Sequence, residues 1–111
     1  MSRDHSERLQ DILDAITAIR SHLRRGDLSD GLVYDAVRVR LIEIGEAVKG
    51  IPDEVLASEP GLPWSAIARM RDRLAHHYFD TEHSHVAGTV AHDLDPLERA
   101  ARRLQGRTTE S

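Results

Sequence analysis

The chain has 111 residues, a length that fits one domain with a modest hydrophobic core. There is no cysteine, so disulfides, thiolate nucleophiles and cysteine-based zinc sites are excluded. The formal net charge of −4 argues against a general nucleic-acid coat protein, although a local basic cleft is compatible with it.

Nothing in the chain predicts a membrane segment. No apolar run approaches the roughly 18 residues that a membrane span needs. The first ten residues, MSRDHSERLQ, are charged and lack the apolar stretch of a secretory signal. We therefore expect a cytoplasmic protein without a membrane partner.

The apolar residues of the first half recur with helical spacing. A first helix is predicted over residues 4–25, and a second over about 29–49 with Ser29 or Asp30 as its N-cap. The predicted core stripes contain Leu9, Ile12, Leu13, Ile16, Ile19 and Leu23 in the first helix, and Val37, Leu41, Ile44, Val48 and Ile51 in the second.

The second helix has two unusual features. Val39 and Ile42 widen its apolar stripe, which predicts burial on two sides. Gly45 lies inside it, although glycine costs about 1 kcal/mol relative to alanine in a helix. We expect another helix to cross closely at this glycine.

The second half predicts a connector, two further helices and a tail. Residues 52–62 form the connector, with a short helical turn at 53–58. Pro63 suits the first turn of the next helix, which should fray near Tyr78. The last helix is predicted over about 82–104, with a kink at Pro96.

The sequence therefore predicts an all-α fold, an antiparallel bundle of four main helices plus a short connecting turn. A single domain is expected over residues 1–104. Residues 105–111 are expected to be a polar, disordered tail.

Reactive side chains are densest in the segment RMRDRLAHHY, residues 69–78. Arginine can grip a phosphate with two hydrogen bonds, and histidine can transfer protons near neutral pH. Arg71 and His76 therefore suit phosphodiester cleavage, with Arg69 and Arg73 as further contacts to phosphate or RNA.

The geometry of one helix separates the two main residues. Arg71 and His76 lie about 140° apart around a helix, whereas Arg71 and Tyr78 share a side. The pair converges if the arginine wraps around, or if two copies of the helix face each other. We expect a homodimer with the active site at the subunit interface. Asp72 precedes His76 by four residues, so its carboxylate is placed to orient the imidazole.

Simpler explanations exist for the same residues. Arginines on a helix are usually a solvated face or ion pairs, and a histidine near a helix end often caps the last carbonyls. Glu46 is assigned to an ion pair or helix packing rather than to the site. The four histidines His76, His77, His83 and His85 favour polar surface over a metal site, so no metal or cofactor is expected.

The spacing Arg71-Asp72-x-x-x-His76-x-Tyr78 resembles the R-x4-H-x-Y motif of the HepT-like toxins, a branch of the HEPN (higher eukaryotes and prokaryotes nucleotide-binding) superfamily. The stretches IGEA at 44–47, LPWS at 62–65 and Asp93-Leu94 ahead of Pro96 are similar to other parts of that family. The resemblance spans most of the chain and implies a HEPN-like helical fold.

The resemblance also implies an activity. It implies a metal-independent endoribonuclease, a nuclease of the EC 3.1 class of hydrolases, acting as the toxin of a type VII-like toxin–antitoxin pair. In such enzymes the RNA 2′-hydroxyl attacks the adjacent phosphate. Arg71 would hold that phosphate and His76 would act as general acid or base. Tyr78 matches the tyrosine that a nucleotidyltransferase antitoxin inactivates by AMPylation.

One position departs from the family pattern. The residue after the motif arginine is commonly Asn in these toxins and is Asp72 here, whose carboxylate partly neutralises Arg71. Two alternatives stay open: a non-catalytic HEPN module that binds a nucleotide or a protein, and a purely structural helical subunit.

Overall fold

The computed structural model describes residues 5–76 and 79–110, with side chains except at 79–81 and 108–110. Its helices, in chain order, are α1 (His5–Leu23), α2 (Gly31–Lys49), α3 (Asp53–Leu56), α4 (Trp64–Ala75), α5 (Phe79–His92) and α6 (Leu94–Glu110). The described ranges contain no strand, and the predicted all-α class is confirmed. Within those ranges, no helix is both long and apolar enough to cross a membrane.

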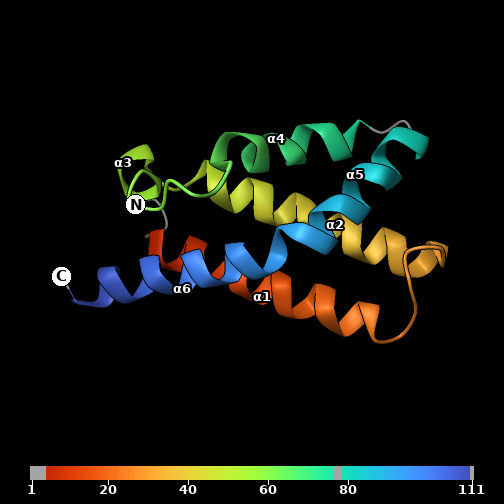
Figure 1. Ribbon diagram of the computed structural model, residues 1–111, viewed down its shortest axis with the longest axis horizontal. Coiled ribbons are helices and arrows are strands. Elements are labelled where there is room, and N and C mark those ends of the chain that lie inside the picture. The colour runs from red at the N-terminus through yellow and green to blue at the C-terminus, as the bar shows by residue number, and fades with distance from the viewer. Residues whose placement is uncertain (1–4, 77–78, 111) are drawn as a thin grey trace.

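Helix α2 lies at the centre of the bundle. It packs against α1 on one side and against α4 on the other, and α6 packs along α1 (Figure 1). The predicted stripes of α1 and α2 are buried, apart from Leu23 at the end of α1, which is partly exposed. The prediction that α2 is buried on two sides is confirmed, but Val39 is 46% exposed and takes no part in it.

The start of α2 is fixed by its own sequence. Of the two predicted N-caps, Asp30 takes this position, and its carboxylate accepts hydrogen bonds from the main-chain N–H groups of Leu32 and Val33 at 2.9 and 3.5 Å. These bonds satisfy two of the four donors that a helix start leaves without partners in the helix.

The close helix crossing predicted at Gly45 is confirmed. A Cβ atom on Gly45 would lie 2.9 Å from the main-chain nitrogen of Arg71 and 3.0 Å from the carbonyl oxygen of Ile67. Both are backbone atoms of α4, which cannot move without shifting the helix. The absence of a side chain therefore allows α4 to approach α2 at the residue that the sequence marks as catalytic.

The single kinked helix predicted around Pro96 is wrong. The chain forms two helices instead, because α5 ends at His92 and α6 begins at Leu94. Pro96 lies in the first turn of α6, where its missing N–H needs no partner within the helix. The N–H of Leu97 instead donates to the carbonyl of Asp93 at 3.0 Å and starts the new helix.

The helix predicted to end at Leu104 continues to Glu110. Its extension is tied to the rest of the bundle through Glu59, whose side chain is only 11% exposed. Arg103 Nη2 lies 2.7 Å from this carboxylate, and Arg107 Nη2 lies 2.9 Å from it. The division into a domain at 1–104 and a tail at 105–111 stays a prediction.

The close helix crossing at Gly45 predicts whether a substitution there raises or lowers the free energy of unfolding. Gly45→Ala should lower the free energy of unfolding by about 1–3 kcal/mol, because overpacking against backbone outweighs the gain in helix propensity. Gly88→Ala is the matched control, since nothing lies within 4 Å of a Cβ at that position of α5. It should raise the free energy of unfolding by about 0.5–1 kcal/mol. Urea denaturation measures both, and equal effects of the two substitutions would contradict the close crossing.

Candidate functional site

Arg71 lies where α4 crosses α2 and binds two carboxylates. Its Nε lies 2.9 Å from Glu46 Oε2 on α2, and its Nη1 donates to Asp72 Oδ1 at 2.9 Å. Lys49 Nζ lies 3.7 Å from the other oxygen of Asp72. The four side chains form a chain of alternating charge, Glu46–Arg71–Asp72–Lys49. Each is between 43% and 54% exposed, so solvent and dissolved anions can reach the cluster.

The cluster carries two cations and two anions, so its formal charge is balanced. The hydrogen bond from Arg71, supported by the charge of Lys49, lowers the pKa of Asp72. Asp72 and Glu46 in turn raise the pKa of Arg71. The guanidinium is thus permanently charged, and carboxylates already bind two of its three nitrogens, Nε and Nη1.

His76 caps the C-terminal end of α4. Its Nδ1 lies 2.7 Å from the main-chain oxygen of Asp72. Because a carbonyl can only accept, Nδ1 carries the proton in this contact, and Nε2 is the nitrogen left to exchange a proton with a substrate. The imidazole is therefore oriented by the main-chain carbonyl of Asp72 and not, as predicted, by its carboxylate. The Asp72 carboxylate turns instead to Arg71 and Lys49.

Arg71 and His76 both contact Asp72 within a single subunit, but at different groups. Arg71 binds the carboxylate of Asp72, and His76 binds its main-chain carbonyl. The angular separation of Arg71 and His76 around α4 stays a prediction. Tyr78 and His77 lie outside the described residues.

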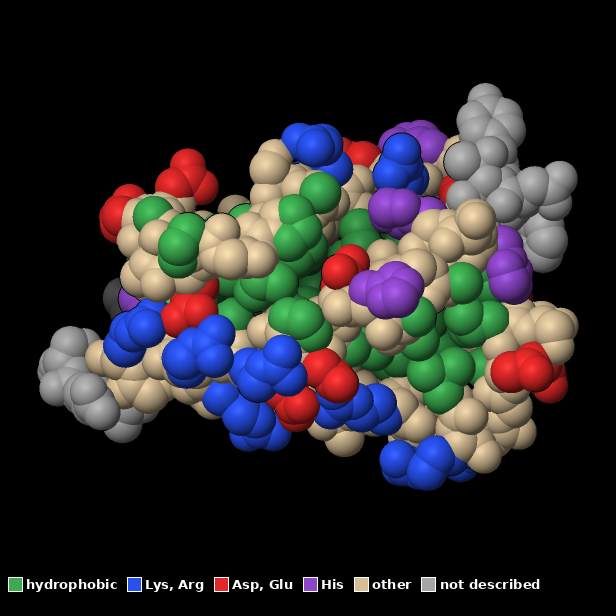
Figure 2. All heavy atoms as spheres, viewed as in Figure 1, with side chains coloured by type: hydrophobic (Ala, Val, Ile, Leu, Met, Phe, Trp, Pro, Cys, Tyr) green, Lys and Arg blue, Asp and Glu red, His purple; other side chains and the backbone are tan. Residues whose placement is uncertain are grey.

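The other two arginines of α4 lie beside this cluster. Arg69, Asp72 and Arg73 line a surface hollow of about 350 Å³. Arg69 Nη1 donates to Ser65 Oγ at 2.6 Å. Figure 2 shows blue Lys and Arg side chains and purple His side chains gathered along the upper edge of the molecule. Arg69 and Arg73 are four residues apart and therefore lie on the same face of α4.

Arg73 reaches across to α5, where its Nη1 lies 3.3 Å from His85 Nδ1. A guanidinium can only donate, so this ring nitrogen accepts and the proton of the neutral imidazole lies on Nε2. Burial, and then the charge of Arg73, lower the pKa of His85 and favour this neutral form. The contact with Arg73 accounts for the position of His85, and neither metal binding nor proton transfer is needed to explain it. In the described ranges, no three His, Cys, Asp or Glu side chains gather in a way that could hold a metal ion.

Two residues of α2 hold the site together. The ion pair expected of Glu46 is confirmed, and its partner is Arg71. Arg38, also on α2, donates through Nη1 to the carbonyl of Leu74 at 2.6 Å and so fixes the last turn of α4 before His76. Nothing in the local sequence marks Arg38, because the contact joins residues far apart in the chain.

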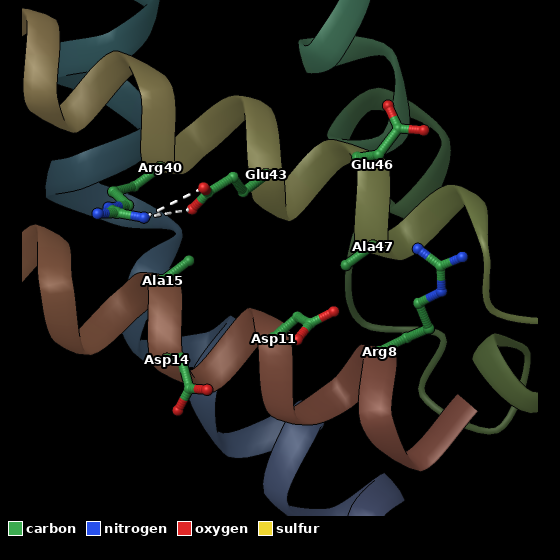
Figure 3. A pocket seen from close by; sticks show the side chains of 8 residues that line it. All are labelled: Arg8, Asp11, Asp14, Ala15, Arg40, Glu43, Glu46 and Ala47. Carbon is green, nitrogen blue, oxygen red and sulfur yellow. Dashed lines mark hydrogen bonds and ion pairs between the residues drawn. The ribbon is translucent and has the colours of Figure 1, made fainter. Parts of the chain in front are cut away.

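A separate groove lies between α1 and α2 and has a volume of about 360 Å³ (Figure 3). Glu46 lies at one end, with its carboxylate directed away from Asp11 and Asp14. The charged residues that line the groove are the carboxylates Asp11, Asp14, Glu43 and Glu46 and the arginines Arg8 and Arg40. Carboxylates outnumber arginines in this groove, so an anion is better accommodated along α4.

Helical bundles that expose an arginine and a histidine on one helix occur in several kinds of protein. Comparison with known proteins identifies the family of this chain. The chain matches the family described as Ribonuclease HepT-like over residues 9–104, and it belongs to this family. The resemblance inferred from the motif is thereby confirmed.

Named relatives agree with this assignment. The chain is 35% identical over 109 residues to a protein of Thermococcus cleftensis named probable ribonuclease HepT, covering 95% of this chain and 99% of that protein. Two candidate RNases of Methanocaldococcus jannaschii are also similar. One is 34% identical with 76% of this chain and 73% of that protein covered, and the other is 31% identical with 87% and 84% covered. No solved structure matches the chain significantly.

The charge cluster predicts a measurable titration. In the wild type, the carboxyl group of Asp72 should titrate below its ordinary value of 3.8, because Arg71 and Lys49 favour the charged form. Arg71→Gln removes the larger of these influences and should raise the pKa of Asp72 toward that value. Carbon-detected NMR across an acid titration measures the shift.

Arg102→Gln is the matched control, since Arg102 binds Glu98 on the surface of α6. It should leave the pKa of Asp72 where it is. An unchanged Asp72 in Arg71→Gln would show that the two side chains do not pair in solution.

Proposed function

We propose that this protein is a metal-independent endoribonuclease that acts as the toxin of a type VII-like toxin–antitoxin pair. The observation that carries the proposal is that Arg71 and His76, both exposed on α4 and its C-cap, each contact Asp72. Membership of the HepT-like ribonuclease family supports RNA as the substrate.

The chemistry follows from the two side chains. The 2′-hydroxyl of a ribose loses its proton and attacks the adjacent phosphorus, and the bond to the 5′-oxygen of the next nucleotide breaks. The products are a cyclic phosphate and a 5′-hydroxyl, and the leaving oxygen takes up a proton. The proposal assigns one of these proton transfers to His76 Nε2, since Nδ1 is engaged with the Asp72 carbonyl. Arg71 stabilises the charge that develops on the phosphate oxygens.

A substrate phosphate that binds Nη1 of Arg71 replaces the carboxylate of Asp72 at this atom. Exposed ion pairs such as Arg71–Asp72 contribute only about 0–1 kcal/mol, whereas a two-pronged bond between arginine and phosphate is stronger. A phosphate can therefore displace Asp72 while Glu46 keeps Arg71 Nε in place. The displaced carboxylate retains Lys49 as its counter-ion.

We further propose that the active enzyme is a homodimer with the site at the subunit interface. Arg71 and His76 lie about 140° apart around one helix, so Arg71 of one subunit and His76 of the other can reach the same phosphate where two α4 helices face each other. Two α4 helices facing each other would supply a second Arg71 and a second His76 to one phosphate.

A non-catalytic module that binds a nucleotide or a protein is the second candidate. The observation that favours it is the balanced charge around Arg71, where Glu46 and Asp72 already occupy the guanidinium. Such a module would bind its ligand without turnover.

The proposed activity predicts cleavage of RNA in the presence of EDTA. His76→Ala should lower the cleavage rate by about 10²–10⁴-fold, the range expected when a general acid or base is lost. Arg71→Ala should abolish measurable cleavage. His92→Ala removes another exposed histidine, at the end of α5, and should have no effect. A gel assay on purified protein measures the rates.

Binding of RNA without cleavage by the wild type would support the non-catalytic module instead. Mixing the two inactive variants tests the dimer in the same assay. If one site takes groups from both subunits, the mixture of Arg71→Ala and His76→Ala recovers part of the activity. If each subunit has a complete site of its own, the mixture stays inactive.

We also propose that a nucleotidyltransferase antitoxin inactivates the protein by transferring AMP to Tyr78. The added phosphate would lie two residues along the sequence from His76 and would exclude the RNA backbone by repulsion. The only other tyrosine, Tyr34, is 4% exposed and thus shielded from an enzyme.

Co-expression with such a nucleotidyltransferase should therefore add the mass of one or more adenylyl groups to the chain. Tyr78→Phe should abolish the mass shift and keep the RNase active, while Tyr34→Phe should leave the shift in place. Intact-protein mass spectrometry measures it. A modified Tyr78→Phe protein would place the acceptor elsewhere.

A further inference from the structure

A second hollow adjoins the Arg71 cluster and has a different character. It has a volume of about 490 Å³ and lies between the end of α2, α3 and the start of α4. Its walls include Ile51, Leu56, Ala68 and the indole of Trp64. We call this hollow the Trp64 recess. An apolar recess with one aromatic wall suits a flat, apolar ligand rather than a phosphate.

The indole of Trp64 is held in a fixed orientation. Its Nε1 donates to the carbonyl of Glu59 at 2.8 Å, and the Glu59 carboxylate is held by Arg103 and Arg107 of α6. The polar edge of the indole is thereby satisfied by the protein. Its ring contributes a preorganised apolar wall, which loses little entropy on binding a ligand.

The rim of the recess is continuous with the candidate phosphate site. Lys49 and Ser65 both line the recess. Lys49 Nζ lies 3.7 Å from Asp72 Oδ2, and Ser65 Oγ accepts the hydrogen bond from Arg69. A ligand in the recess is therefore next to the groups that surround Arg71. The long Lys49–Asp72 contact leaves the ammonium group available to a phosphate.

We propose that the Trp64 recess binds one unpaired nucleobase of the RNA, adjacent to the phosphate held by Arg71. The base stacks against Trp64, and Lys49 at the rim contacts the connecting phosphodiester. Stacking on an aromatic side chain next to a cationic groove is the general way in which proteins hold single-stranded nucleic acid. A base inside a duplex cannot enter the recess, so the preferred substrate is a single strand or a loop.

This inference rests on the proposed ribonuclease function and specifies its substrate. The competing occupant is an apolar side chain from a second copy of the protein. The lining includes Lys49 and one carboxylate, Asp53, and Arg69 adjoins it through Ser65. This surplus of cations favours the base, because Lys49 and Arg69 match the phosphates that flank a nucleotide.

The single tryptophan gives a direct readout of the recess. The experiment titrates the full-length protein with an RNA hexamer, methylated at every 2′-oxygen to prevent cleavage, and follows tryptophan fluorescence. A second hexamer with the same backbone and no bases keeps the phosphates and removes the stacking. We expect the first hexamer to quench Trp64 and to bind about tenfold more tightly than the abasic one.

A filled recess provides the matched test. Ala57 lines the recess and is exposed at the end of α3, so Ala57→Phe should fill it without disturbing Arg71 or His76. This variant should bind the hexamer only as tightly as the abasic strand. Ala91→Phe, on the exposed surface of α5, should behave as the wild type. Circular dichroism of both variants verifies that they are folded.

The outcomes separate this inference from the proposed function. If the wild type cleaves RNA but the two hexamers bind and quench equally, the nucleobase site is refuted and the ribonuclease stands. If it neither cleaves RNA nor binds either hexamer, both are refuted. A change in Trp64 emission with protein concentration alone, and none with the hexamers, would identify a second copy as the occupant and overturn the proposal.

Discussion

The site depends on the backbone contact between α2 and α4 at Gly45. Without a side chain at this position, the two helices approach until a Cβ would touch the main chain of α4. Three side chains of α2 then hold α4 and its charged residues in place. Arg38 fixes the end of α4, Glu46 holds Arg71, and Lys49 balances Asp72. Wider spacing of the helices would leave Arg71 without Glu46 and the end of α4 without Arg38.

The same contact accounts for the electrostatics of the site. Helix α4 carries three arginines on an acidic protein, but α2 supplies a carboxylate to the central one. The resting cluster is therefore nearly neutral and offers little to a passing polyanion, since non-specific binding grows with the number of phosphates neutralised. A phosphate that binds Nη1 of Arg71 competes there with Asp72.

The fold was largely predictable from the sequence because its helices follow simple rules. Apolar residues at steps of three and four identified the buried faces of α1 and α2, and Gly45 identified the crossing. The prediction failed at Pro96, where a proline in a first turn and one inside a kinked helix look alike in sequence. In the site, Arg71, Asp72 and His76 were identifiable from their spacing. The roles of Glu46 and Arg38 were not, because each pairs with a partner on another helix that only the packing brings close.

The size of α4 limits how much RNA one subunit can contact. Its 12 residues span about 18 Å, and the Arg71 cluster, Arg69 and the Trp64 recess all lie along this length. Such a footprint covers only a few nucleotides and presents few groups that could read base edges. Under the proposed nucleobase site, selectivity comes from local RNA shape, since a strand with an unstacked base occupies the recess and the guanidinium together while a regular duplex contacts only the cations. The link from Glu59 to α6 supports this proposal, because it fixes the indole against which the base would stack.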